Sequence, residues 1–263
     1  MGFAVSTKRN ADTASCMAAR QWANELGVPY IERQRKGTLE EMLAAHQLDA
    51  ILLATAQGPQ IFTTSGVFFY HPGMAVLRLK QLKRGVKDNF AEAMELKSGM
   101  RILDCTLGLA GDASIASYIA GSSGRVVGLE ASRLLSFAVQ YGLRRYEAED
   151  SDLTDALRRI ESINIEAEHY LANCGPDSFD AVYFDPMFRW PVTSSKVMES
   201  LRPIAYDKPL TMQAVQLALK AAPKVVIKER SEKILRSYGC TEITGGRYSR
   251  VKYGIIRRQT GEE

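Results

Sequence analysis

From residue 99 onward, short apolar runs alternate with longer stretches of helical spacing in a regular order. The runs RILDCT, GRVVGLE, DAVYFD and KVVIKE are rich in β-branched residues, and DASIASYIAG and MQAVQLALKAA are two of the stretches between them. Strands that alternate with helices predict a mostly parallel sheet covered by helices on both faces. We therefore expect an α/β fold, with two further strands joined around glycines in CTEITGGRYSRVKYGII.

The segment before this pattern is expected to form a smaller α/β region. Its expected strands are FAVST, PYIER, DAILLAT and GVFFYH. A further strand, SINIEA, is expected in the later part of the chain. ASCMAARQWANELG, TLEEMLAAH and MAVLRLKQLKRG are expected as helices, and QGPQIFTTSG as a turn. Loop chemistry in GVKD and KSG predicts a boundary near residues 85–98. We expect an N-terminal domain at 1–90, a candidate for substrate recognition, and a catalytic domain at 91–263.

The composition indicates the class of protein but does not indicate its function. The chain has 263 residues, 46% of them hydrophobic and 24% charged, which predicts a globular protein. A net charge of +4 permits a nucleic-acid partner but does not require one. Four scattered cysteines predict reduced thiols in a cytoplasmic protein, and three dispersed histidines give no metal signal. The apolar runs are too short to predict a membrane span.

Three of the expected strands end in an acidic residue. Asp104 is followed by the small residues of LDCTLGLAGDA, Glu130 ends GRVVGLE, and Asp185 begins the stretch DPMF. Ligands of open parallel sheets bind beyond the carboxyl ends of the strands, so these residues are candidates for a site. Each signal alone is weak, because Asp-Pro also simply ends a strand. Their order and spacing together favour function.

This order resembles the class I, Rossmann-like methyltransferases that use S-adenosylmethionine. Asp104 and Gly108 fit their first motif, in which Thr106 and Ala110 replace frequent glycines, and DPMF resembles the (Asp/Asn)-Pro-Pro-(Tyr/Phe) motif of amino-group methyltransferases. The final glycine-linked strands resemble the antiparallel pair that ends that fold. DCTLGLAGDA and VYFDPMF together are most similar to the YhiQ/RsmJ family, which methylates the exocyclic amine of a guanosine in small-subunit ribosomal RNA.

The resemblance implies roles for individual residues. S-adenosylmethionine is the implied cofactor, held by Asp104, Thr106, Gly108, Ala110, Asp112, Glu130 and Ala131, with Glu166 and Glu168 near its adenine. Asp112 is expected to order the cofactor loop. The implied partner is ribosomal RNA or the small ribosomal subunit, and no metal is required.

The DPMF stretch suggests how an amine would be methylated. Asp185 and the carbonyl of Pro186 can each accept an N–H hydrogen bond and so orient the nitrogen, while Phe188 can stack on the base. Met187 and Arg189 are expected beside the substrate. Basic residues ahead of the catalytic domain, Arg78 and Lys80 among them, are candidates for phosphate contacts, although a solvated helix face explains them equally well.

Two alternatives remain open from the sequence. The same cofactor can serve a methyltransferase that acts on a protein or small-molecule amine. A dinucleotide-dependent enzyme is ranked lower, because GLAGDA with Glu130 fits that fingerprint only loosely and leaves DPMF unexplained.

Overall fold

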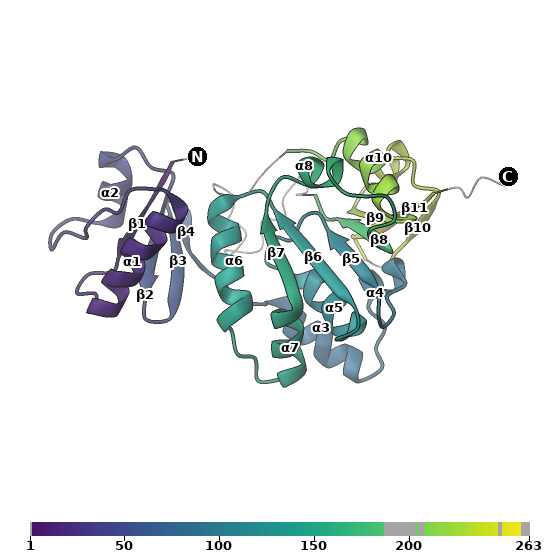
Figure 1. Cartoon of the computed structure of the whole chain (residues 1–263), viewed down its shortest axis with the longest axis horizontal. Helices are drawn as coiled ribbons and strands as arrows, with labels where there is room; N and C mark the ends of the chain where they lie inside the picture. Colours follow the sequence, from purple (N-terminus) through teal and green to yellow (C-terminus); the bar gives the residue numbers. More distant parts are fainter. Residues whose placement is uncertain (1, 187–203, 205–207, 247–248, 259–263) are drawn as a thin grey trace. The chain divides into compact units, whose positions relative to one another are not determined.

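The computed structural model describes residues 2–186, 204, 208–246 and 249–258. Contacts divide the chain into two compact units, each with its own sheet (Figure 1). The smaller unit consists mainly of residues up to His71, and the larger unit holds most of the remaining described residues.

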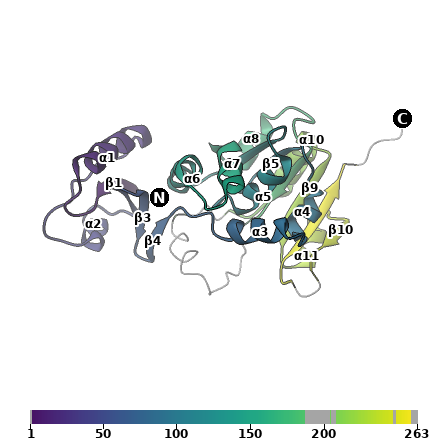
Figure 2. The ribbon, with the colours of Figure 1, turned by 90° about the horizontal axis from the view of Figure 1, so that it is seen from below.

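The smaller unit is a four-stranded sheet with two helices. Its strands, in sheet order, are β1 (Phe3–Thr7), β2 (Ala50–Thr55), β3 (Gly58–Thr63) and β4 (Gly66–Phe69). β1 and β2 are parallel, and the other pairs are antiparallel. The helices α1 (Thr13–Leu26) and α2 (Leu39–Ala45) lie on opposite faces of the sheet (Figure 2). The side chains of Asp12 and Thr38 cap them, so the local sequence determines where both helices begin.

Two segments of this unit differ from the expectation. The stretch 57–66, expected as a turn, is largely strand β3. Its Pro59 pairs with Ala54 of β2, but β4 joins β3 only from Gln60 onward, so the proline sits where a missing N–H is tolerated. PYIER, expected as a strand, makes only an isolated bridge between Tyr30 and Val5.

The larger unit contains a seven-stranded sheet in the order β10-β11-β9-β8-β5-β6-β7. The strands are β5 (Arg101–Asp104), β6 (Arg125–Glu130), β7 (Ile160–Asn164), β8 (Ala181–Phe184), β9 (Lys224–Glu229), β10 (Glu242–Thr244) and β11 (Lys252–Arg257). Neighbours from β7 to β9 are parallel, whereas β11 is antiparallel to both β9 and β10. The predicted mostly parallel sheet with an antiparallel C-terminal pair is confirmed.

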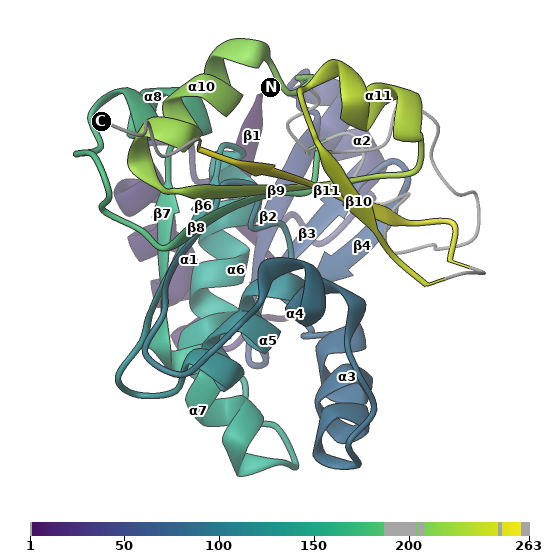
Figure 3. The same ribbon diagram turned by 90° about the vertical axis from the view of Figure 1, so that its right-hand side faces the viewer.

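Helices cover both faces of this sheet (Figure 3). The helices on one face are α8 (Ala167–Ala172), α10 (Met212–Ala221) and α11 (Glu232–Ser237). The remaining helices of this unit are α3 (Met74–Lys83), α4 (Asn89–Met94), α5 (Gly111–Ala120) and α7 (Ser151–Arg159). The contact division splits α6 (Arg133–Arg145), whose residues 137–142 belong to the smaller unit. α5 packs on β5, β6 and β7 and is flanked by α3 and α7. Under α8 and α10, Leu103, Val182 and Phe184 belong to a buried core.

One strand boundary within the larger unit departs from the expectation. The strand expected at SINIEA begins earlier, at Ile160, whose side chain is buried in the core. Ala167, the last residue of SINIEA, is the first residue of α8. The contact division comes at His71–Pro72, so α3 belongs to the larger unit and packs with α5. No helix among the described residues has the length and apolar character that crossing a membrane requires.

Candidate active site

The carboxyl ends of three adjacent parallel strands bring the predicted acids to one edge of the large sheet. β8, β5 and β6 are neighbours, and Asp104 lies in register with Tyr183 on one side and Gly128 on the other. Asp185 follows Tyr183 by two residues, and Glu130 follows Gly128 by two. Strand register alone therefore places Asp104, Glu130 and Asp185 close together, as the sequence predicted.

The loop from β5 to α5 has a tightly determined backbone. The N–H of Leu107 donates to the carbonyl of Leu129, which ties the loop to β6. Gly108 and Ala110 both adopt positive φ, 49° and 60°, so Ala110 occupies a conformation that glycine would adopt with less strain. Gly128 is needed beside the loop, because a Cβ at this position would lie 2.4 Å from the Leu107 side chain.

Glu130 is nearly buried at the end of β6. Its carboxylate accepts hydrogen bonds from two backbone N–H groups, that of Gly108 at 3.2 Å and that of Ser132 at 2.8 Å. Burial raises the pKa of this carboxyl, and the two N–H donors oppose the shift. The side chain thereby holds the loop at the tip of β6 and keeps its carboxylate in a defined position.

Asp104 is more deeply buried, with 3% of its surface exposed. Its Oδ1 accepts a hydrogen bond from the backbone N–H of Thr106 at 3.0 Å. Burial, together with the negative charges of Asp112 and Asp185, raises the pKa of Asp104 to about 8. Among the described residues, no cationic side chain forms an ion pair with this carboxyl.

Asp185 is held from two directions. Its backbone N–H donates to the hydroxyl of Thr106 at 2.6 Å, and its Oδ2 accepts from Nζ of Lys228, at the end of β9, at 2.7 Å. Burial raises the pKa of Asp185 to about 6; the Lys228 charge opposes that shift, and the Asp112 charge adds to it. The carboxylate thus lies at the carboxyl edge of the sheet, fixed to the loop and to the neighbouring strand.

Comparison with known proteins identifies the kind of site. The family described as "Putative SAM-dependent methyltransferase", where SAM is S-adenosylmethionine, matches residues 46–241. The chain belongs to this methyltransferase family. It is 35% identical over 224 residues to the uncharacterized protein YpiP of Bacillus subtilis, covering 85% of this chain and 86% of that one.

A second relative is named for its substrate. The chain is 27% identical over 221 residues to the ribosomal RNA small subunit methyltransferase J of Pseudomonas fluorescens, covering 82% of this chain and 80% of that one. A crystal structure of a SAM-dependent methyltransferase from Neisseria gonorrhoeae shares the fold, with a TM-score of 0.61 at 15% identity over 98% of this chain and 97% of that one. The resemblance drawn from the sequence is confirmed.

SAM is the cofactor of this methyltransferase, and the residues present fit it. SAM carries a cationic α-amino group, which would supply the charge partner that Asp104 otherwise lacks among the described side chains. A Cβ added to Gly111 would meet no atom within 4 Å, so the first turn of α5 opens onto space. Glu130 places carboxylate oxygens at the next strand end, where hydroxyl groups of a ribose can bind.

Asp112 lies in the first turn of α5 and is held by three side chains. Its Oδ1 accepts from Nη1 of Arg78 at 2.6 Å, and its Oδ2 accepts from the Tyr183 hydroxyl at 2.8 Å and from Nζ of Lys228 at 3.2 Å. Burial opposes its ionisation, but Lys228 and Arg78 outweigh burial and lower the pKa of Asp112. The expected role of Asp112 in ordering the cofactor loop stays a prediction.

The phosphate contact expected of Arg78 does not suit its position. Its guanidinium makes ion pairs with Asp88 at 2.7 Å and with Asp112 at 2.6 Å, and only 18% of its side chain is exposed. The sequence could not reveal this, because both partners come from other elements. Lys80, on the same helix, is exposed, and its predicted contact with phosphate stays a prediction.

The residues expected near the adenine make contacts within the protein. Glu166 precedes α8 and pairs with Lys208 at 3.5 Å, while Glu168 accepts from the hydroxyl of Thr211 at 2.5 Å. The carbonyl of Ala131 accepts a 3.3 Å hydrogen bond from the side-chain amide of Asn164. Their roles toward the cofactor stay predictions.

Of the predicted residues that follow Asp185, the structure describes only Pro186. Pro186 is described and partly buried directly after Asp185. Met187, Phe188 and Arg189 lie outside the described residues, so their predicted contacts with the substrate stay predictions.

Lys228 and Tyr183 are site residues that the sequence reasoning missed. Lys228 stands in KVVIKE, where the rule applied to Asp104, Glu130 and Asp185, an acid at the end of an apolar strand, points to Glu229 instead. Tyr183 carried no such signal, because a tyrosine within a buried strand is usual.

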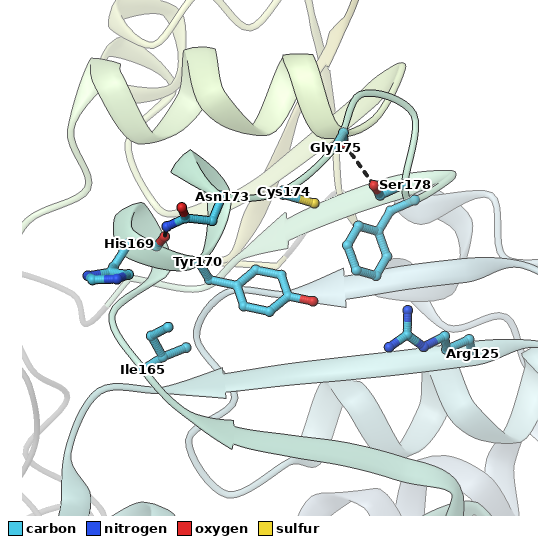
Figure 4. A pocket seen from close by; sticks show the side chains of 9 residues that line it. Arg125, Ile165, His169, Tyr170, Asn173, Cys174, Gly175 and Ser178 are labelled. Atoms are coloured by element: carbon cyan, nitrogen blue, oxygen red, sulfur yellow. Dashed lines mark hydrogen bonds between the residues drawn. The ribbon is translucent and has the colours of Figure 1, made fainter.

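A cavity of about 410 Å³ lies elsewhere, on the sheet face beside α8 (Figure 4). Its lining includes Tyr170 and Cys174, together with Arg125 at the start of β6. None of the residues predicted for the cofactor or the substrate lines it. The side chains of Asp104, Glu130 and Asp185 do not line this hollow.

Proposed function

We propose that this methyltransferase modifies the exocyclic amine of a guanosine in ribosomal RNA, within the cytoplasm. The observation that carries the proposal is the position of Asp185-Pro186 at the carboxyl end of β8, beside the strand ends of Asp104 and Glu130. Relatives named ribosomal RNA small subunit methyltransferase J support an RNA acceptor.

Different residues of the site would bind the cofactor and the acceptor. Asp104, Glu130 and the loop through Gly108 would hold SAM. When bound, SAM supplies a methyl group on a sulfonium sulfur. The lone pair of the acceptor nitrogen forms the new N–C bond, and the electrons of the broken C–S bond stay on sulfur. The nitrogen then releases a proton to water. Asp185 and the carbonyl of Pro186 accept N–H hydrogen bonds from the amine, which orients its lone pair and stabilises the positive charge that develops.

The smaller unit offers a surface for the RNA backbone. Lys8 and Arg9 directly follow β1, and the loop containing Arg35 and Lys36 meets them, because the Arg9 guanidinium donates to the carbonyl of Gly37. Lys8, Arg9, Arg35 and Lys36 are exposed. Neighbouring cations of this kind favour phosphate groups, so we assign substrate recognition to this unit.

A protein or small-molecule amine remains the alternative acceptor. Asp185 and Pro186 would orient such an amine in the same way, so the strand-end geometry does not choose between acceptors. The basic loops of the smaller unit favour RNA, because phosphates of an RNA chain can contact these loops and a small molecule does not extend to them. The dinucleotide-dependent alternative is set aside, since the family uses SAM.

The decisive experiment supplies purified protein with SAM labelled in its methyl group and compares small-subunit RNA, intact small subunits and a protein mixture as acceptors. We expect label in RNA, at one guanosine, identified by mass spectrometry as N2-methylguanosine. RNA isolated from cells without the protein should lack that modification. Label in protein or in a small molecule, with none in RNA, would establish the alternative.

A further inference from the structure

Lys228 is a largely buried lysine at the end of a buried strand. Val225, Val226 and Ile227 precede it without any exposed surface, and 20% of its own side chain is exposed. Removing an ammonium group from water is costly unless carboxylates compensate for it. Here Asp185 and Asp112 compensate, at 2.7 Å and 3.2 Å.

Asp112 determines where the ammonium lies. Its two oxygens accept from Arg78, Tyr183 and Lys228, and Arg78 is held in turn by Asp88 at 2.7 Å. These partners come from α3, α5, β8, β9 and the residue before α4. Lys228 is thus fixed from the side of Asp112, whatever binds at Asp185.

The contacts of Asp185 leave it one acceptor atom. Its Oδ2 is engaged by Lys228 and its backbone N–H by Thr106. Among the described residues, Oδ1 of Asp185 has no hydrogen-bond donor. We propose that Lys228 is a positioning residue that holds Oδ2 of Asp185 and so leaves Oδ1 to accept the N–H of the target amine. This inference rests on the proposed function of Asp185.

The same contact keeps Asp185 ionised. Burial and the carboxylate of Asp112 favour its protonated form, and Lys228 opposes both. The other acids that face this cluster are Glu229, Tyr183, Asp104 and Tyr253, which is in register with Lys228 on β11. The Arg78 guanidinium pairs with Asp112, so Lys228 supplies the positive charge in contact with Asp185, and its removal raises the pKa of that carboxyl further.

A matched control exists on the same strand. Lys224, at the start of β9, is 6% exposed and pairs with Glu95 at 2.9 Å. Lys224→Met removes a buried ammonium from β9 without altering a contact of Asp185. Lys228→Met removes the positioning contact, and Lys228→Arg keeps a cation there.

The experiment measures kcat and KM for methyl transfer to RNA between pH 5 and 8 in the four proteins, with SAM affinity measured alongside. For Lys228→Met we expect kcat to fall about 10- to 100-fold near neutral pH, with SAM affinity unchanged, as for a misplaced catalytic group. The acidic limb of its pH profile should move to higher pH. Lys228→Arg should recover part of kcat, and Lys224→Met should keep the parent profile.

Two results would overturn the inference. One is a Lys228→Met profile that matches that of Lys224→Met; the other is an equal loss in Lys228→Met and Lys228→Arg. Should Lys228→Met fail to fold, Asp112→Asn releases the ammonium from its other side, so kcat should fall because the partner of Oδ2 of Asp185 is no longer fixed. The acidic limb should here move to lower pH, because the carboxylate that raises the pKa of Asp185 is gone. An unchanged kcat would count against the proposal. Absence of methyl transfer to RNA by the parent protein would refute the proposed function instead.

Discussion

The hydroxyl of Thr106 accepts a hydrogen bond from the backbone N–H of Asp185 at 2.6 Å. One residue of the cofactor loop is thereby joined to the acid that would orient the acceptor. The N–H of Thr106 itself bonds to Asp104 at 3.0 Å, so the link passes from one strand-end acid to the other. Thr106 replaces a glycine that is frequent in the motif the loop resembles, and a glycine could not make this contact.

Thr106→Val should disturb the acceptor side of the site more than the cofactor side. The change keeps the shape of the side chain but leaves the N–H of Asp185 without its partner, at a cost of about 1–3 kcal/mol. We expect kcat for methyl transfer to fall about 10-fold or more, with a smaller change in SAM affinity. Thr106→Ser keeps the hydroxyl and should retain most of the activity; equal losses in both variants would show that the bond has no role.

Asp185→Ala should separate chemistry from binding. It removes a carboxylate that would act on the amine, while Glu130 and Asp104, at other strand ends, are untouched. We expect transfer of labelled methyl to fall about 10²–10³-fold, the scale of one preorganised electrostatic contact, with SAM affinity little altered. A folded Asp185→Ala protein that methylates at the parent rate would mean that Asp185-Pro186 only ends the strand.

The pH dependence of kcat should report on Asp185. Burial raises the pKa of this carboxyl to about 6, and its ionised form is the stronger acceptor for the amine N–H. The rate should therefore be steady above that pKa and fall as pH drops through about 6, with a limiting slope of one. Asp185→Asn, which does not titrate, should show lower activity without this limb. An acidic limb that persists in Asp185→Asn would assign it to another group.

Strand-end logic predicted much of this site from the sequence, because strand register alone aligns Asp104, Glu130 and Asp185. It did not predict the pairing of Arg78 with Asp88 and Asp112, since a charged helix face has the same sequence pattern whether it meets solvent or carboxylates. Lys228 was missed for a related reason: a lysine near a strand end is common, and only the tertiary structure supplies its two acids.

The departures in secondary structure have local causes. β3 was hidden by Gly58 and Pro59, which usually mark turns but here lie at a strand end that β4 does not reach. The short helix α8 follows β7 after two residues, so their patterns merge in SINIEA. Periodicity resolves long elements and cannot separate short ones joined so closely.

Asp104→Asn should stabilise the protein without SAM and weaken SAM binding. Because the folded pKa of Asp104 is about 8, above its ordinary value of 3.8, folding favours the protonated form. The destabilising effect of this group is absent below pH 3.8 and grows as pH rises toward 8. The uncharged amide avoids it, so the free energy of unfolding at pH 7 should rise by about 1–3 kcal/mol. Denaturant unfolding would show this gain.

The same variant loses the charge that would pair with the α-amino group of SAM. Calorimetry at pH 7 should therefore show weaker binding by about tenfold or more, as for a lost charge-assisted hydrogen bond. The gain in stability should vanish well below pH 3.8, where Asp104 is neutral in both states. Unchanged SAM affinity would remove Asp104 from the cofactor site.

The basic loops of the smaller unit should control RNA affinity and its salt dependence. Lys8, Arg35 and Lys36 are exposed, so replacing all three by alanine should leave folding and SAM affinity intact. If they neutralise phosphates, the slope of log K against log salt should become shallower by up to about 0.7–0.9 per lost contact. The comparison variant is Lys80→Ala, which tests the phosphate contact predicted for this residue of α3. A slope altered only by the α3 variant would move RNA recognition from the loops to that helix.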